Sequence, residues 1–210
     1  MTRGNLRSHG AAHFQLLYDG STDPWGFRTS AYEQEKYDRT VAVLGGRRFR
    51  RGFEAGCSIG VLTRRLAQQC DALLAVDIVE APLESARVAC ADVPWVRFER
   101  MDIAAAWPEG AFDLIVLSEV LYFLSPAAIA VVADRVTASI APDGMVLLVN
   151  WLGHGDDPVS GDDAARMFIA AAPRLTVTQA VRETGYRLDV LMENLSRASR
   201  GRDRGAKRRG

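Results

Sequence analysis

The sequence predicts a doubly wound α/β fold, in which helices cover both faces of a mostly parallel sheet. Runs that are apolar almost without interruption alternate with segments of helical periodicity, as expected for buried parallel strands joined by right-handed crossovers. Two later runs alternate, or nearly alternate, apolar and polar residues, which predicts an antiparallel hairpin at the sheet edge. With 210 residues, the chain is long enough for one such domain.

Seven runs are expected to form the sheet, the first five of them in parallel. The turn of the final hairpin falls at Glu183-Thr184-Gly185. The runs are 51–55, 73–77, 96–100, 112–117, 145–151, 175–182 and 186–191.

Helices are expected between the first strands and before the sheet. Apolar side chains recur at helical spacing around Leu62, Leu83 and Val132, and the third of these helices is expected to end at a turn over 141–144. Two further helices, 11–18 and 30–44, precede the sheet and are separated by Asp23-Pro24-Trp25-Gly26. We therefore expect a helical cap over 1–49, a core over 50–195 and a tail over 196–210.

Charge is concentrated in that tail. The net formal charge is zero, yet segment 196–210 holds seven basic residues and one acid. It has no large apolar residue, so it is predicted to be disordered. Such a tail could bind RNA, but a solvated tail is the more common role, so nucleic acid is not the expected partner.

A reducing cytoplasm is the expected location. No apolar run is long enough to span a membrane, and the polar N-terminus lacks the apolar segment of a secretory signal. The three cysteines form no C-x-x-C pair, which argues against a disulfide framework and a structural zinc site. No metal is expected.

The strongest motif ends the first expected strand and opens a helix, and it runs Glu54-Ala55-Gly56-Cys57-Ser58-Ile59-Gly60. Glycine lets a backbone approach a cofactor closely, and the amides of the following helix point at an anionic group. Glu54 would place a carboxylate beside the cationic amino-acid end of S-adenosylmethionine. The spacing matches E/D-x-G-x-G-x-G, with Ser58 in place of one glycine. A nicotinamide or flavin Rossmann domain is disfavoured, because aligning G-x-G-x-x-G on Gly56 leaves its other two glycines missing.

Acids at the next two strand ends extend the expected cofactor site. Asp77 ends the second strand, where it can accept hydrogen bonds from ribose hydroxyls. Asp102 follows the third strand, where an acid can meet the adenine amino group, with Ile78 and Ile103 as apolar walls. The remaining cofactor residues are expected in the motif and at the end of the fourth strand: Glu54, Gly56, Cys57, Ser58, Gly60 and Ser118.

Together these motifs resemble class I S-adenosylmethionine-dependent methyltransferases and, more narrowly, the nodulation protein S family. The resemblance covers roughly 14–191 and implies a Rossmann-like, seven-stranded sheet with S-adenosylmethionine as cofactor. Family members methylate the amine of a deacetylated end sugar in a chitooligosaccharide, which implies N-methylation of a small molecule, amino sugar or oligosaccharide. The narrower resemblance rests on four segments: Asp23-Pro24-Trp25-Gly26-Phe27, Tyr32-Glu33-x-x-Lys36, Leu62-Thr63-Arg64-Arg65-Leu66 and Ser118-Glu119-Val120-Leu121-Tyr122. An O-methyltransferase, an RNA methyltransferase and a non-catalytic cofactor-binding protein stay open as alternatives.

Three residues are candidates for the chemistry. Glu119 follows the fourth strand, where it could take a proton from an amine or orient the amine. It could also only interact favourably with a helix dipole. Tyr122 lies beside it in sequence, and His154 sits between two glycines after the fifth strand.

The cap supplies further candidates. Trp25 and Tyr32 could cover the adenosine, stack on a sugar face or simply pack the cap onto the sheet. Glu33 and Lys36 are interpreted as a solvated helix face, and His13 has no evident partner. The sequence does not indicate an oligomeric state.

Overall fold

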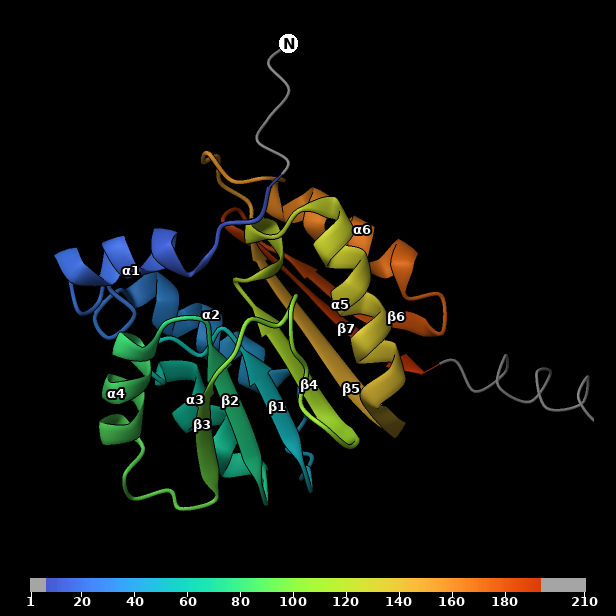
Figure 1. The fold of residues 1–210 in the computed structure, drawn as a ribbon. Helices are drawn as coiled ribbons and strands as arrows, with labels where there is room; N and C mark the ends of the chain where they lie inside the picture. The colour runs from blue at the N-terminus through green and yellow to red at the C-terminus, as the bar shows by residue number, and fades with distance from the viewer. Residues whose placement is uncertain (1–6, 194–210) are drawn as a thin grey trace, which may run out of the picture.

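The computed structural model describes residues 7–193 as a seven-stranded sheet with helices on both faces (Figure 1). The strand order is β3-β2-β1-β4-β5-β7-β6. Strands β1 to β5 pair in parallel, and β7 is antiparallel to both β5 and β6. The strands are β1 (Gly52–Ala55), β2 (Leu73–Asp77), β3 (Val96–Arg100), β4 (Phe112–Ser118), β5 (Ile140–Trp151), β6 (Leu175–Arg182) and β7 (Tyr186–Glu193). The predicted fold class is confirmed, whereas the expected basic tail lies outside the described residues.

The helices divide between the two faces of the sheet. Helices α5 and α6 pack on one face and α2, α3 and α4 on the other, while α1 lies across the ends of the strands (Figure 1). Serines begin three of them: the side chains of Ser30, Ser125 and Ser160 each accept a backbone hydrogen bond from the third residue that follows. The helices are α1 (Ala11–Gly20), α2 (Ala31–Ala42), α3 (Val61–Leu66), α4 (Glu80–Ala89), α5 (Pro126–Ser139) and α6 (Gly161–Ala171).

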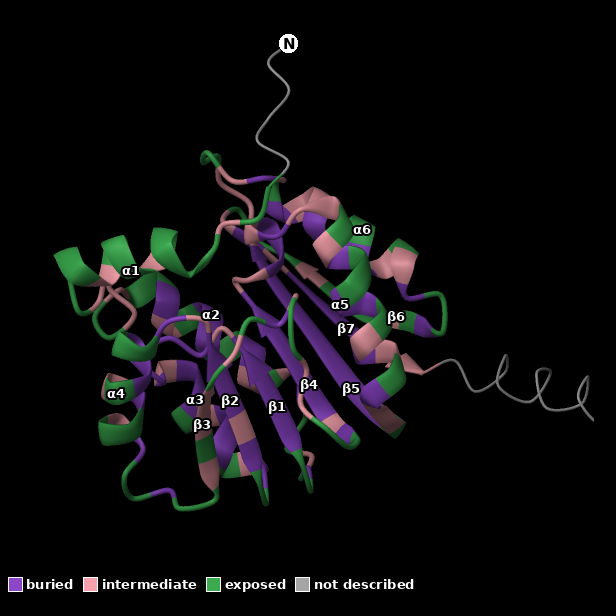
Figure 2. Cartoon of the chain, viewed as in Figure 1, coloured by how far each residue is buried: buried purple, intermediate pink, exposed green. Residues whose placement is uncertain are grey.

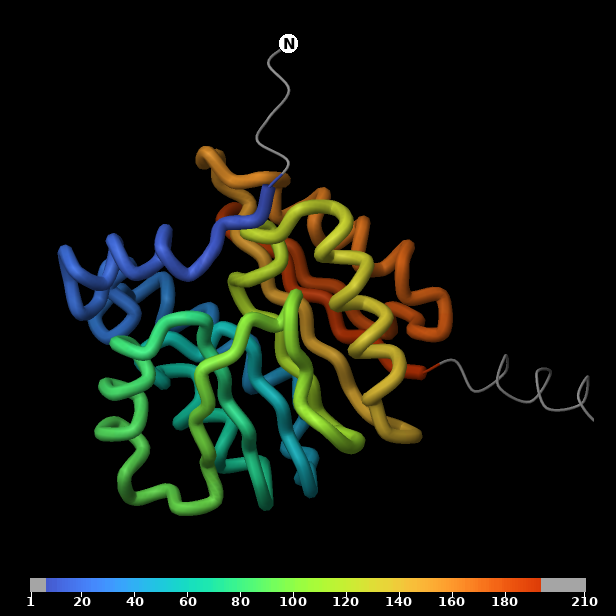
Figure 3. Tube along the Cα trace, in the orientation of Figure 1, coloured from blue at the N-terminus to red at the C-terminus, as the bar shows by residue number. Residues whose placement is uncertain are grey.

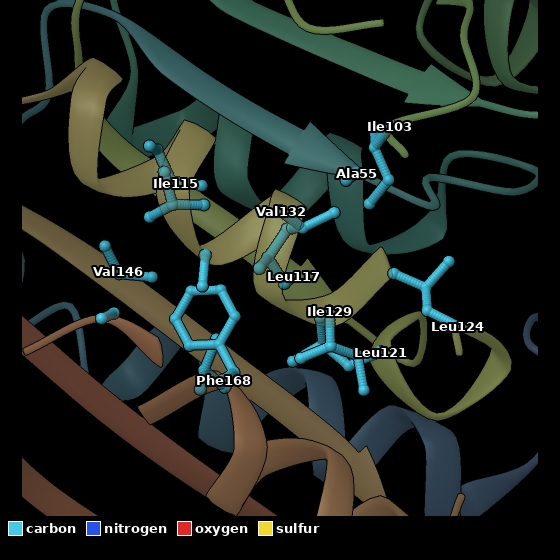
Figure 4. Close-up of a cluster of buried hydrophobic side chains, with 14 of the residues drawn as sticks. Ala55, Ile103, Ile115, Leu117, Leu121, Leu124, Ile129, Val132, Val146 and Phe168 are labelled. Atoms are coloured by element: carbon cyan, nitrogen blue, oxygen red, sulfur yellow. The ribbon is translucent and has the colours of Figure 1, made fainter. Parts of the chain in front are cut away.

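The core explains why the strand runs are apolar without interruption. Successive side chains of β4 point to opposite faces, so Ile115 and Leu117 pack under α5 and α6 while Leu114 and Val116 pack against α2 and α3 (Figure 4). Both faces are covered, and β1 and β4 are buried along nearly their whole length (Figure 2). The edge strand β3 is only partly buried.

Two details differ from the sequence prediction. The predicted turn over 141–144 lies inside β5, because pairing with β4 passes from Phe112–Ile140 to Leu114–Met145 and leaves these residues as a bulge. Asp143 adopts a left-handed backbone there, with φ of 59°. Helix α6 was not predicted at all, since Phe168 is the one large apolar side chain among its four buried residues, beside Gly161, Ala164 and Ala165.

Candidate active site

A cavity of about 780 Å³ lies at the carboxyl ends of the central strands, beneath α1. Open parallel sheets bind ligands at this edge, and the volume is typical of a small-molecule site. Its walls come from the loops after β1, β2, β3, β4 and β5 and from the N-terminal cap. A smaller adjoining pocket continues toward the start of α3.

The structure brings most of the expected cofactor residues to these two pockets. The main cavity is lined by Gly56, Ser58, Asp77, Ile78, Asp102 and Ile103. The adjoining pocket is lined by Glu54, Cys57 and Ser118. Gly60 lines neither, because it packs where α3 meets α4.

Local crowding explains the two glycines of the motif. Gly56 has φ of +77°, and a Cβ atom there would lie 2.1 Å from Cγ1 of Val120. Gly60 has φ of +80°, and its Cβ would lie 3.0 Å from that of Ala86. Ser58 also has a left-handed backbone, with φ of 49°, although it carries a side chain. The loop therefore keeps a glycine-type path with a serine at one of its positions.

Asp77 is held by the same loop. Its Oδ2 accepts a hydrogen bond from the Ser58 amide at 2.9 Å, and its Oδ1 accepts one from the Val79 amide at 3.0 Å. Burial raises the pKa of Asp77 to about 6, against the opposing effect of these amides. A carboxylate oxygen can accept more than one hydrogen bond, so both oxygens can still bind hydroxyls.

Glu54 is a buried acid on β1. Burial raises its pKa to about 7, while the nearby Thr63 hydroxyl opposes the rise. Its Oε2 has no hydrogen-bond partner among the described residues. A buried, incompletely paired carboxylate is costly, and a cationic ligand group in the adjoining pocket would compensate it.

The prediction of a solvated face at Glu33 and Lys36 is wrong. Lys36 is 2% exposed, and its Nζ lies 2.9 Å from Oε1 of Glu33 and 2.8 Å from Oε1 of Glu119. Burial lowers the pKa of Lys36, but the two carboxylates outweigh it and the pKa is raised. This part of the α2 face points inward, because Glu33 and Lys36 line the cavity.

Glu119 is fully engaged by donors. Its Oε1 accepts a hydrogen bond from Lys36. Its Oε2 accepts hydrogen bonds from the Tyr122 hydroxyl at 2.7 Å and the Trp151 amide at 3.0 Å. Its backbone is left-handed, with φ of 58°. Burial raises the pKa of Tyr122 well above its usual range, and Glu119 raises it further. Both candidate residues line the cavity, but as members of a fixed network.

His154 is exposed and does not line the cavity, whereas its neighbours Asp156 and Asp157 do. The N-terminal segment runs beside this loop (Figure 3), and His9 Nε2 lies 3.5 Å from Oδ1 of Asp157. His13 does have a partner: its ring stacks on that of His9 with centroids 4.1 Å apart. His13 is itself exposed, and partial desolvation together with the neighbouring His9 lowers its pKa. This cluster could not be predicted from the sequence, because no local pattern joins positions as distant as His9 and Asp157.

Aromatic side chains of the N-terminal cap form another wall of the cavity. Trp25 and Tyr32 line the cavity, and Lys36 Nζ lies 5.1 Å from the Tyr32 ring centroid. Tyr18, which sequence analysis did not single out, packs against Trp25 and places its hydroxyl oxygen 2.5 Å from Oγ of Ser58.

No group of three or more histidine, cysteine, aspartate or glutamate side chains within residues 7–193 is placed to hold a metal ion. No helix in that range is long and apolar enough to cross a bilayer.

This sheet order, with a ligand-sized cavity at its carboxyl edge, defines the class I methyltransferase fold. The N-methyltransferase NodS of Bradyrhizobium japonicum, solved with S-adenosyl-L-homocysteine, has this fold: its TM-score is 0.74 at 21% identity, over 86% of this chain and 97% of that one. A candidate methyltransferase from Pseudomonas syringae is 32% identical with a TM-score of 0.68, over 79% of this chain and 100% of that one.

The sequence comparisons assign the chain to one family within this fold. The family model described as nodulation protein S matches residues 14–149, and the chain belongs to this family. The nodulation protein S of Sinorhizobium fredii is 30% identical over 136 residues, which cover 63% of each chain. That of Bradyrhizobium diazoefficiens is 33% identical over 58% of this chain and 59% of its own. The match therefore spans about three fifths of the length of these relatives.

Proposed function

We propose that this protein is an S-adenosylmethionine-dependent methyltransferase that N-methylates an amine of a small molecule, amino sugar or oligosaccharide in the cytoplasm. One observation carries the proposal: the motif loop and Asp77 face a single cavity at the carboxyl edge of the sheet. Membership of the nodulation protein S family supports it, as does the S-adenosyl-L-homocysteine bound by the Bradyrhizobium japonicum NodS.

The residues present fit the cofactor. Asp77 can bind the ribose hydroxyls, and Asp102 can meet the adenine between Ile78 and Ile103. The unpaired Oε2 of Glu54 suits a cationic amino group. When bound, the sulfonium supplies an activated methyl group. The chain itself must align the acceptor, exclude water and take up the proton that the amine loses.

We assign proton uptake to the histidine cluster rather than to Glu119. The Glu119 carboxylate already accepts hydrogen bonds from three donors, one of which is the Tyr122 hydroxyl. His13 lines the same cavity, and its lowered pKa favours the neutral form that can accept a proton. Glu119 and Tyr122 act as positioning residues, and Trp25 and Tyr32 cover the ligands.

Calorimetry with S-adenosylmethionine, S-adenosyl-L-homocysteine and NADH tests the cofactor assignment. We expect micromolar affinity, close to −8 kcal/mol, for the first two and no binding of NADH. Transfer of a radiolabelled methyl group to a deacetylated chitooligosaccharide then tests the acceptor, with the fully acetylated oligosaccharide as control. Labelling of both sugars would point to a hydroxyl acceptor, and binding without transfer to any amine would favour a non-catalytic role.

A further inference from the structure

Ser58 has a backbone conformation that normally favours glycine. Its φ of 49° lies in the left-handed region, between the left-handed Gly56 and Gly60. A side chain at such a position is strained, and persists where its surroundings hold it. Glycine would adopt the same backbone without strain. The Ser58 side chain must therefore be explained by what it contacts.

Ser58 makes two contacts that point in different directions. Its amide donates to Oδ2 of Asp77 at 2.9 Å, on the side of the proposed ribose site. Its hydroxyl oxygen lies 2.5 Å from the hydroxyl oxygen of Tyr18, on the cap helix α1. One residue thus joins the cap helix to the cofactor-binding acid.

Helix α1 needs such an anchor. None of its ten residues is buried, and a helix of this length is marginal by itself. The face of α1 toward the cavity carries Phe14, Leu17 and Tyr18. The rings of Phe14 and Phe123 pack edge-to-face, with their centroids 4.9 Å apart. Among the hydrogen bonds of the described residues, the one between the hydroxyls of Tyr18 and Ser58 joins α1 itself to the motif loop.

We infer that Ser58 and Tyr18 are a pair of positioning residues that dock α1 over the bound cofactor and slow its release. The serine hydroxyl, at a position where the methyltransferase motif has glycine, provides the docking point. Because Ser58 also orders Asp77, cofactor contact and closure of the cap share one residue. This inference rests on the proposed function, since it concerns the same cofactor site.

A double-mutant cycle tests the pair. Tyr18→Phe keeps the ring against Trp25 and removes only the hydroxyl, while Ser58→Ala keeps the side-chain strain and removes the other hydroxyl. We expect each variant to release S-adenosyl-L-homocysteine about threefold to tenfold faster, the effect of one hydrogen bond. The double variant should release it no faster than either single one. Stopped-flow fluorescence measures the rates, with Trp25 as a reporter in the cavity.

Hydrogen–deuterium exchange supplies a second readout. Amides of α1 should exchange faster in both single variants while those of the central strands stay unchanged, which separates loss of docking from loss of folding. Leu16→Ala is the matched control on the same helix, because Leu16 is 74% exposed and lies outside the cavity lining. Its release rate should equal that of the parent protein.

The outcomes separate this inference from the proposed function. If the parent protein binds S-adenosyl-L-homocysteine but Tyr18→Phe and Ser58→Ala release it at the parent rate, the docking role is overturned alone. Additive effects in the double variant would equally overturn the pairing. If the parent protein binds neither S-adenosylmethionine nor its product, the proposed function fails, and the inference fails with it.

Discussion

Lys36 and Glu119 are 83 positions apart in the chain, yet their side chains form a buried ion pair with Nζ and Oε1 separated by 2.8 Å. The pair joins α2 to the end of β4, where Glu119 has a left-handed backbone. Glu33 shares the same ammonium group. The cap and the sheet are therefore connected by charge at the wall of the cavity.

Lys36→Met should lower the free energy of unfolding by about 3–5 kcal/mol, because it leaves the buried Glu33 and the partly buried Glu119 without their cation. Urea denaturation measures the loss. Arg48→Met is the matched control, since its ion pair with Asp71 is mostly exposed and should be worth at most about 1 kcal/mol. Equal losses in the two variants would contradict a structural role for the buried pair.

Glu54→Gln should raise the stability of the free protein at pH 8. The folded pKa of Glu54 is about 7 against an ordinary value of 4.5, so the ionised acid disfavours the folded state by at most ~3 kcal/mol above pH 7. Between about pH 4.5 and 7 the folded chain binds this proton more tightly than the unfolded chain, so its contribution to stability falls as the pH rises. Denaturation at pH 5 and 8 should therefore show the gain shrinking at the lower pH.

Asp77 supplies the sharpest test of the cofactor site. Asp77→Ala should weaken S-adenosylmethionine binding by about tenfold to a hundredfold, through loss of the proposed ribose contacts and of the Ser58 amide contact. Asp113→Ala is a matched control, because Asp113 also accepts two backbone amides, from Arg50 and Arg51, but lies at the amino end of β4. Calorimetry showing equal affinity losses in both variants would refute the assignment.

Two histidines compete for the role of proton acceptor. His13→Ala should lower turnover about a hundredfold near neutral pH while the affinity for S-adenosylmethionine stays unchanged. His154→Ala should leave turnover unchanged, since that side chain lies outside the cavity. The opposite result, loss of turnover only in His154→Ala, would return the role to the loop after β5. Rates across pH 6–9 on a deacetylated chitooligosaccharide provide the comparison.

The parallel core could be predicted because strands covered on both faces are apolar throughout. The motif residues could be predicted because each lies at or just beyond the carboxyl end of a strand. Helix α6 was missed because Phe168 is the one large apolar side chain among its buried residues, the others being Gly161, Ala164 and Ala165. The burial of Lys36 was not predicted, because a charged helix face is usually solvated and the sequence does not show that Glu119 lies opposite it. The contact of His9 with Asp157 depends on the path of the N-terminal segment over the sheet, which no local pattern encodes.

The order of the last two strands also constrains how the protein is made. Strand β7 lies between β5 and β6, although it is the last strand of the described chain. Until it is synthesised, β5 presents an open edge and β6 has no neighbour to pair with. An unpaired apolar strand edge is prone to association. A ribosome-bound chain that ends before β7 would therefore expose an aggregation-prone surface. Early termination before residue 186 should thus yield aggregation rather than a smaller folded protein.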